Sequence, residues 1–128
     1  MGVAPRTAGG VREFRIPRYR FATSTQNYIQ SGVNFSLNGS LVLDVSKFRT
    51  LKIETVDLYS YEKYYKFNIQ DDTNGKSIYT YSVNETYSHS YRSNLSLDLT
   101  GIDQITISAS GSYGDRDQQC TCTNIVLS

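Results

Sequence analysis

Tryptophan is absent from this chain of 128 residues, and histidine occurs only once and cysteine twice. Long apolar runs are also absent, since no segment approaches the roughly 20 consecutive apolar residues of a membrane-spanning helix. The first residues contain no apolar stretch of the roughly 7 to 15 residues that marks a secretory signal. We therefore expect a soluble protein with no membrane span.

The single histidine and the two cysteines restrict the chemistry. A Ser-His-Asp triad would have to recruit His89 from the middle of an aromatic segment, where an isolated histidine is usually structural. Glycoside hydrolysis needs two carboxylates about 5 to 9.5 Å apart across a cleft, but the adjacent pair Asp71-Asp72 opens a loop-like segment. Cys120 and Cys122 share one face of a predicted strand, where a disulfide between them would be strained. Two cysteines without further ligands cannot form a structural zinc site. We therefore expect two buried thiols in a protein that is not an enzyme and binds no cofactor.

Calcium is the metal with the best-suited ligands in the sequence. Hard oxygen ligands gather at Asp71, Asp72 and Asn74, and again at Asp115 and Asp117. Neither spacing matches a complete calcium-binding loop. The sequence therefore predicts no metal site, and these residues are its only calcium candidates.

Charge divides the chain into two parts. The totals of 13 basic and 12 acidic residues nearly cancel, but in the first 20 positions five arginines oppose only Glu13, a net charge of +4. The rest of the chain has eight basic and eleven acidic residues. Pro17 would remove a backbone donor from any strand ladder that crossed it. We expect an extended basic arm at residues 1–25 and one folded domain at residues 26–128.

Apolar residues alternate with the arginines of this arm. Phe14 and Ile16 fall on one side of an extended chain, and Tyr19 and Phe21 repeat the alternation after a change of phase at Pro17. Either the segment packs on its own domain as an edge strand, or it reaches a neighbouring subunit as an assembly arm. Nucleic acid is disfavoured, because five arginines without lysine clusters form a modest electrostatic footprint. The assembly arm would use Arg12, Phe14, Arg15, Ile16, Arg18, Tyr19, Arg20 and Phe21.

From residue 27 onward, segments rich in Val, Ile, Thr and Tyr alternate with Gly, Asn, Asp and Ser. No helical pattern is convincing, although Leu58, Tyr61 and Tyr65 would also fit one helical turn. Connections this short favour one antiparallel β-sandwich of about eight or nine strands, of the jelly-roll kind. The predicted strands are Tyr28–Phe35, Ser40–Val45, Thr50–Leu58, Tyr64–Gln70, Ser77–Val83, Tyr87–Tyr91, Leu95–Leu99, Gln104–Ser110 and Cys120–Leu127.

An internal repeat is the most specific pattern in the sequence. Residues 40–53 match residues 94–107, and both read Leu-x-Leu-Asp-aliphatic-hydroxyl-x-apolar-x-x-aliphatic-x-Ile after their first residue. This pattern describes a strand, a turn in which an aspartate and a hydroxyl bond nearby backbone groups, and a second strand. Two equivalent corners would give the sandwich approximate internal symmetry, although any strand-turn-strand unit converges on part of this pattern.

The phrases Leu-Asp-Val-Ser-x-Phe-x-x-Leu-x-Ile and Leu-Asp-Leu-Thr-Gly-Ile-x-x-Ile-x-Ile, followed by the final Asn-Ile-Val-Leu, resemble galactose-binding-like jelly-roll sandwiches. Such domains occur as carbohydrate-binding modules and as accessory domains of phage structural proteins. The resemblance covers about residues 28–128. It implies the fold more than a sugar site, because its motifs describe corners and because sugar modules of this kind commonly use the tryptophan that this chain lacks.

Tyrosines cluster between Tyr59 and Tyr91. A three-residue loop after Val83 would form a hairpin that pairs Tyr79 with Tyr91 and Tyr81 with His89 on one face. A two-residue loop would instead put the two sets on opposite faces. Such a ladder would serve as plain sheet packing, as a subunit interface or as a stacking surface for sugar rings. The candidate glycan or partner face is Tyr79, Tyr81, Tyr87, His89 and Tyr91.

These observations together predict a non-enzymatic structural or interaction protein of a multi-subunit assembly. We expect a bacteriophage virion component, such as a capsid decoration, neck or tail accessory protein, made in the host cytoplasm and partnered by like or unlike protein subunits. The alternative is an extracellular carbohydrate-binding module that uses the tyrosine-rich face. The two hypotheses differ in whether the basic arm is needed for function.

Overall fold

The computed structural model describes residues 6–7, 10–11, 13–22, 34–37, 39–60, 64–84, 88–111 and 119–128. These residues form strands and no helix, so none of them belongs to a helix that could cross a membrane. The strands are β1 (Arg6–Thr7), β2 (Gly10–Val11), β3 (Phe14–Ala22), β4 (Asn34–Leu37), β5 (Ser40–Asp44), β6 (Thr50–Ser60), β7 (Tyr64–Asp71), β8 (Lys76–Asn84), β9 (Ser88–Asp98), β10 (Gln104–Gly111) and β11 (Gln119–Leu127).

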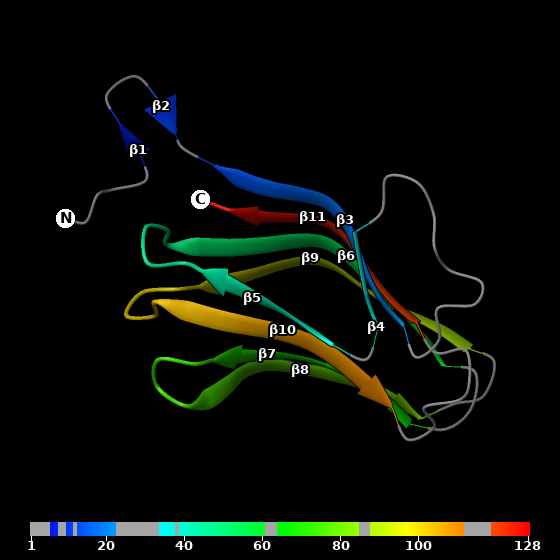
Figure 1. Cartoon of the computed structure of the whole chain (residues 1–128). Helices are drawn as coiled ribbons and strands as arrows, with labels where there is room; N and C mark the ends of the chain where they lie inside the picture. The colour runs from blue at the N-terminus through cyan, green and yellow to red at the C-terminus, as the bar shows by residue number, and fades with distance from the viewer. Residues whose placement is uncertain are drawn as a thin grey trace.

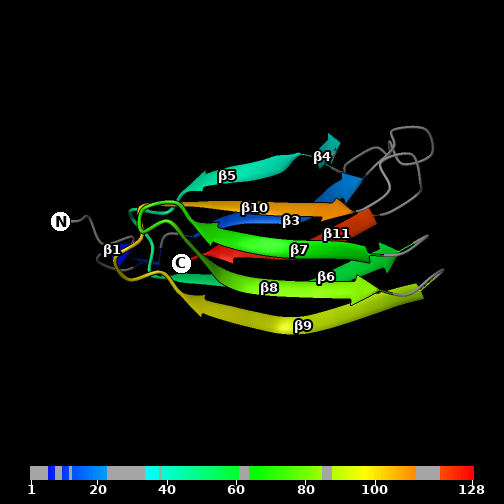
Figure 2. The same cartoon turned by 90° about the horizontal axis from the view of Figure 1, so that it is seen from below.

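Two sheets pack face to face (Figure 1, Figure 2). One has the order β4-β3-β11-β6-β9 and the other has the order β5-β10-β7-β8. All pairings in these two sheets are antiparallel except that of β3 with the short β4. From β5 to β11 the chain changes sheet between consecutive strands except at the β7–β8 hairpin, and β3 lies beside β11. This order is that of a double-sheet jelly roll, so the predicted all-β sandwich is confirmed.

Alternate residues of each strand fill the space between the sheets, as the period of two requires. The central strands contribute most of the buried side chains, for example Leu51, Ile53, Val56 and Leu58 in β6. The buried apolar core consists of Ile16, Tyr19, Phe21, Leu43, Val45, Leu51, Ile53, Val56, Leu58, Tyr65, Phe67, Ile69, Leu99, Ile102, Ile105, Ile107, Ala109, Cys120, Cys122, Ile125 and Leu127.

Four strands of the five-stranded sheet change their alternation at one level. In each of them two consecutive residues lie outside the core, namely Pro17 and Arg18, Glu54 and Thr55, Ser93 and Asn94, and Thr123 and Asn124. The three pairings of these strands each skip one pair at this level and keep the same register on both sides of it. Asn94 and Asn124 adopt positive φ angles of 58° and 52° there. The change of phase predicted at Pro17 is therefore part of a feature that crosses four adjacent strands of the sheet, which we call the phase-change row.

This row also explains one error in the predicted strands. The predicted strands Tyr87–Tyr91 and Leu95–Leu99 are one continuous strand, β9. The polar residues between them pass through the phase-change row, where Asn94 takes the left-handed conformation without ending the strand. Of the predicted strand Tyr28–Phe35, only its last two residues are described, and they begin β4.

The two corners of the internal repeat have the same hydrogen bonds. The backbone N–H and hydroxyl of Ser46 donate to Asp44 Oδ1 at 3.0 and 2.7 Å. The backbone N–H and hydroxyl of Thr100 donate to Asp98 Oδ1 at 3.0 and 2.8 Å. The aspartate thus bonds a nearby backbone group as predicted, whereas the hydroxyl bonds the aspartate side chain and not the backbone.

The corners also bond each other reciprocally. The Val45 N–H donates to the Asp103 carbonyl, and the Leu99 N–H donates to the Arg49 carbonyl, both at 2.8 Å. Val45 and Leu99 are equivalent in the repeat, as are Arg49 and Asp103. The predicted approximate symmetry is therefore present at this end of the sandwich.

Candidate functional site

The segment predicted to be an assembly arm supplies a strand of the sandwich. β3 pairs with β11 from end to end, and its last four residues also pair with β4. Ile16, Tyr19 and Phe21 are buried, and the Tyr19 and Phe21 rings meet edge to face at 4.9 Å. This corrects the expectation that these three anchor on a neighbour, because the phase-change row turns both halves of β3 toward their own core. Phe14 is 43% exposed. The assembly arm therefore remains a proposal only for the residues that precede Phe14.

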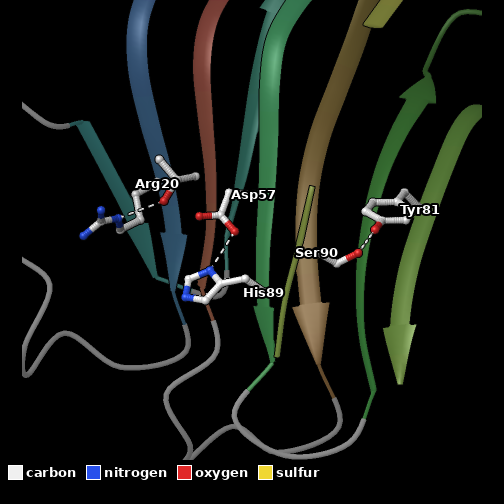
Figure 3. A network of polar contacts seen from close by, with 6 residues as sticks. Arg20, Asp57, Tyr81, His89 and Ser90 are labelled. Atoms are coloured by element: carbon white, nitrogen blue, oxygen red, sulfur yellow. Dashed lines mark hydrogen bonds and ion pairs between the residues drawn. The ribbon is translucent and has the colours of Figure 1, made fainter. Parts of the chain in front are cut away.

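The arginines of the same strand face outward. Arg15 and Arg18 are exposed, and Arg20 is half-buried. The Arg20 Nε–H donates to Thr121 Oγ1 at 3.1 Å (Figure 3). Arg15 Nη2 lies 3.5 Å from Glu13 Oε1, and both side chains are about half exposed. An ion pair this exposed contributes little to stability. We call Arg15, Arg18 and Arg20 the arginine row; Arg12 lies outside the described residues.

The predicted hairpin between Tyr79 and Tyr91 is wrong. β8 pairs with β7, whereas β9 pairs with β6 in the other sheet. β6 and β9 have 11 residues each and pair along their whole length, and a short hairpin of β9 with β8 would satisfy fewer backbone groups. No ladder therefore joins Tyr79 to Tyr91 or Tyr81 to His89, and Tyr87 lies outside the described residues.

Tyr79 and Tyr81 close the edge of the sandwich between β8 and β9. The Tyr79 ring lies 6.2 Å from the Phe67 ring, centroid to centroid. The Tyr81 hydroxyl is hydrogen-bonded to the Ser90 hydroxyl of the opposite sheet (Figure 3). The guanidinium carbon of Arg92 lies 4.0 Å from the centroid of the Tyr81 ring, a cation–π contact. Tyr81 therefore links the two sheets, whereas Tyr79 packs against the core beside Phe67 of its own sheet, and both tyrosines are only partly exposed.

His89 and Tyr91 lie on the outer face of the five-stranded sheet, where Tyr59 joins them. The register places Tyr59 beside His89 and Asp57 beside Tyr91. The His89 ring centroid is 4.5 Å from that of Tyr59 and 5.9 Å from that of Tyr91. The planes of the His89 and Tyr91 rings are 9° apart. His89 Nδ1 lies 3.0 Å from Asp57 Oδ1 (Figure 3). We call Tyr59, His89 and Tyr91 the aromatic row, and Tyr91 is 56% exposed.

The calcium candidates Asp71, Asp72 and Asn74 hold the β7–β8 turn together. Asp71 accepts two backbone N–H groups at 2.9 Å and the Asn74 side-chain amide at 2.8 Å. Burial by itself would raise the pKa of Asp71, but these hydrogen bonds and the charge of Lys76 hold it below its ordinary value. Asp72 accepts two side-chain hydrogen bonds from β10. The described residues contain no group of three or more His, Cys, Asp or Glu suited to a metal.

Cys120 and Cys122 are free thiols buried in the core, as predicted. Burial and the adjacent Cys122 raise the pKa of the Cys120 thiol. Burial also raises the pKa of Tyr65, which packs near both cysteines. Because the thiolate is the reactive form of cysteine, Cys120 is an inert part of the core.

Comparison with known proteins gives similarity at the level of fold only. No protein-family model and no curated protein matches the chain. A structure described as CBM4 structure and function is 12% identical with a TM-score of 0.44, covering 68% of this chain and 59% of that chain, less than two thirds of its length. A virus-like particle of the giant freshwater prawn Macrobrachium rosenbergii extra small virus is 14% identical with a TM-score of 0.31, covering 98% and 84%. A family 29 carbohydrate-binding module is 13% identical with a TM-score of 0.33, covering 71% and 63%.

Carbohydrate-binding modules and a virus-particle protein thus stand among the similar structures. All three identities lie below 25%, and the three TM-scores lie below 0.5. The fold assignment therefore depends on the order and register of the strands and not on these similarities.

Proposed function

We propose that the protein is a non-enzymatic interaction protein of a multi-subunit assembly. In this proposal the assembly is a bacteriophage virion, in which the protein is a capsid decoration, neck or tail accessory component. The observation that carries the proposal is the arginine row, because its three cations point away from the core on one exposed strand. The jelly-roll order supports it, since this architecture serves in viral capsid domains as well as in lectins.

The arginine row suits contact with acidic groups of a neighbouring subunit. Arginine binds carboxylates through two parallel hydrogen bonds, which fixes orientation as well as strength. The β1–β2 hairpin lies beyond the end of the sandwich at which β3 begins (Figure 1). In this proposal the β1–β2 hairpin adds to the same contact. Repetition of such weak contacts around a symmetric particle would make them effective together.

The test is the mass of the full-length protein in solution, measured by light scattering at low and high salt. We expect an oligomer that dissociates at high salt, because exposed charges are screened there. A variant with Arg15→Ser, Arg18→Ser and Arg20→Ser should be monomeric. The matched control removes three cations elsewhere, by Lys47→Ser, Lys66→Ser and Lys76→Ser, and should keep the oligomer. A monomeric wild-type protein, or equal loss in both variants, would contradict self-assembly through the arginine row.

A truncation that begins at Glu13 tests the preceding residues separately. It retains β3, whereas a deletion through residue 25 would remove a strand of the core. We expect the truncated protein to stay folded and to associate more weakly than the full chain. Unchanged association would confine the contact to the sandwich itself.

Glycan binding is the second candidate function, and the aromatic row favours it. The near-parallel rings of His89 and Tyr91 form an exposed stacking surface, and Asp57 beside them accepts hydrogen bonds. We expect Tyr91→Ala to abolish any binding detected on a glycan array. Val42→Ala, at a 54% exposed residue of the opposite sheet, is the control and should have no effect. Binding that survives Tyr91→Ala would rule out the aromatic row as the glycan site.

A further inference from the structure

A hollow of about 410 Å³ opens on the outer face of the five-stranded sheet, at the phase-change row. Its volume falls within the roughly 300 to 1,000 Å³ of ligand sites. It is separate from the aromatic row, none of whose residues lines it. Its polar lining comes from four neighbouring strands: Arg15 of β3, Lys52 and Glu54 of β6, Asn94 and Ser96 of β9, and Asn124 of β11.

The backbone at this hollow is held in an uncommon conformation. Asn94 and Asn124 are the two residues other than glycine with positive φ in the described part of the chain, and both line the hollow. Residues kept in such sparsely populated conformations cluster at ligand sites. The Asn124 side-chain amide donates to Glu54 Oε1, which fixes these two side chains across adjacent strands. Two strained positions thus converge on one preorganised polar surface.

The charges of the lining favour an anion. The register places Arg15, Val126 and Lys52 side by side on three adjacent strands, so the backbone positions of the two cationic residues are about 10 Å apart, with one strand between them. Lys52 forms no ion pair with any described residue, and Arg15 has only its half-exposed contact with Glu13. Glu54 is the single anionic residue of the lining.

The remaining groups favour a polyhydroxylated ring over a simple anion. The amides of Asn94 and Asn124 and the hydroxyl of Ser96 each donate and accept hydrogen bonds. Glu54 accepts hydrogen bonds, which suits a sugar hydroxyl, and its negative charge opposes a dianionic phosphate more strongly than a ligand with a single carboxylate. Val126 offers an apolar patch between the two cations. This combination of cation, amide, hydroxyl, carboxylate and small apolar surface matches one charged sugar ring.

We propose that the hollow binds an acidic saccharide through one hexuronic acid residue. The carboxylate pairs with Arg15 or Lys52, the ring hydroxyls bond Asn94, Asn124 and Ser96, and an apolar face of the ring covers Val126. This role goes beyond assembly through the arginine row, and it needs no contribution from the aromatic row.

The test is a titration of the full-length protein with galacturonic acid and glucuronic acid at constant ionic strength, followed by amide NMR shifts. We expect saturable shifts at Asn94 and Asn124, including their side-chain amides, and none with galactose or glucose. Arg15→Gln or Lys52→Gln should weaken uronate binding about tenfold, the effect of losing one hydrogen bond to a charged group. Lys47→Gln, which removes an exposed cation outside both the hollow and the arginine row, is the control and should leave affinity unchanged.

A second pair of variants separates the hollow from general attraction of anions. Asn94→Gly and Asn124→Gly keep the positive φ and remove the amides, so they should weaken uronate binding while the fold persists. Acetate and phosphate are the probes for the anion alone and should bind more weakly than the uronates. The proposal is overturned if neither uronate shifts the amide signals of the hollow, if acetate or phosphate binds as tightly as the uronates, or if Lys47→Gln weakens binding as much as Arg15→Gln or Lys52→Gln. Shifts confined to His89 and Tyr91 would also overturn it and would instead support the aromatic row.

Discussion

Hydrogen bonds to aspartate side chains hold three turns of the sandwich. Ser46 and Thr100 lower the pKa values of Asp44 and Asp98 through a side-chain and a backbone hydrogen bond each. The pKa of Asp71 is also lowered, by the hydrogen bonds of its own turn and against the effect of burial. The carboxylate form is thus favoured in the folded state at all three positions, and this favours folding wherever the carboxylates are ionised.

These shifts predict loss of stability in acid. In the unfolded chain the three aspartates have ordinary pKa values near 3.8, and in the folded chain the values are lower. Their stabilisation is therefore complete above the unfolded value and disappears as pH falls through the folded values. We expect the contribution of these aspartates to the urea midpoint to be constant from pH 7 to about pH 5, and the midpoint to decrease below about pH 4. The double variant Asp44→Asn and Asp98→Asn should show a shallower fall, and an unchanged fall would contradict this assignment.

Burial of the thiols predicts slow cysteine chemistry. Both cysteines are fully buried, and the raised pKa of Cys120 leaves little thiolate at neutral pH. We expect neither cysteine to react with a disulfide reagent at pH 8 on the time scale on which both react in guanidinium chloride. Absorbance of the released thiol measures this directly. Rapid reaction of the folded protein would show that β11 opens readily or that its inner face is exposed.

At the scale of elements, β3 shows how one strand serves two purposes. Its inward residues complete the core beside β11, while its arginines occupy the outer face. The alternation of the sequence predicted both sets, and the change of phase at Pro17 was visible in it. The sequence could not distinguish an edge strand from a free arm, because β11, the strand that β3 pairs with, lies about 100 residues later in the chain.

The role of β3 predicts unequal effects of two phenylalanine substitutions. Phe21→Ala removes a fully buried ring and should lower the free energy of unfolding by about 3–5 kcal/mol. Phe14→Ala, at the exposed start of the same strand, should cost less than about 1 kcal/mol. Urea unfolding at pH 7 measures both. Equal and small effects would mean that β3 is not a strand of the core.

The two repeated corners differ in backbone conformation at one pair of equivalent positions, Lys47 and Gly101, and should therefore differ in their tolerance of substitution there. Gly101 has a φ of +81° in a turn closed by the Ile102 N–H and the Leu99 carbonyl, whereas the equivalent Lys47 has no positive φ. Gly101→Ala should cost about 1–2 kcal/mol from backbone strain alone, since no atom lies within 4 Å of the added carbon. Lys47→Ala should change stability by less than about 0.5 kcal/mol. Equal effects would show that Gly101 gives up its positive φ at little cost.

At the scale of the whole molecule, the sandwich has one core that both sheets share. β3, near the start of the chain, pairs with β11 at its end, and the two corners bond each other. Removal of any central strand would expose apolar residues of both sheets. We therefore expect one cooperative unfolding transition, with coincident curves from circular dichroism and tyrosine fluorescence. Two separate transitions would contradict the single core.

The outer face of the five-stranded sheet carries every candidate surface described above. His89, Tyr91 and the arginine row were identifiable in the sequence, because they alternate with residues of opposite character. Tyr59 was missed, although Asp57 and Tyr59 alternate with the buried Val56 and Leu58 and this alternation would have placed it. The grouping of Tyr59 with His89 depends on the pairing of β6 with β9, which no local pattern specifies.

The sequence by itself determined the fold class, the two repeated corners and the inward set of most strands. These features depend on the period of side chains along a strand and on bonds between residues close in the chain. Only the tertiary structure decided that β8 and β9 lie in different sheets, that β3 completes the core, and that Asn94 and Asn124 meet at one hollow. The physical reason is that strand pairing depends on matching length and register between distant segments, and neither is recorded in the local pattern of either strand.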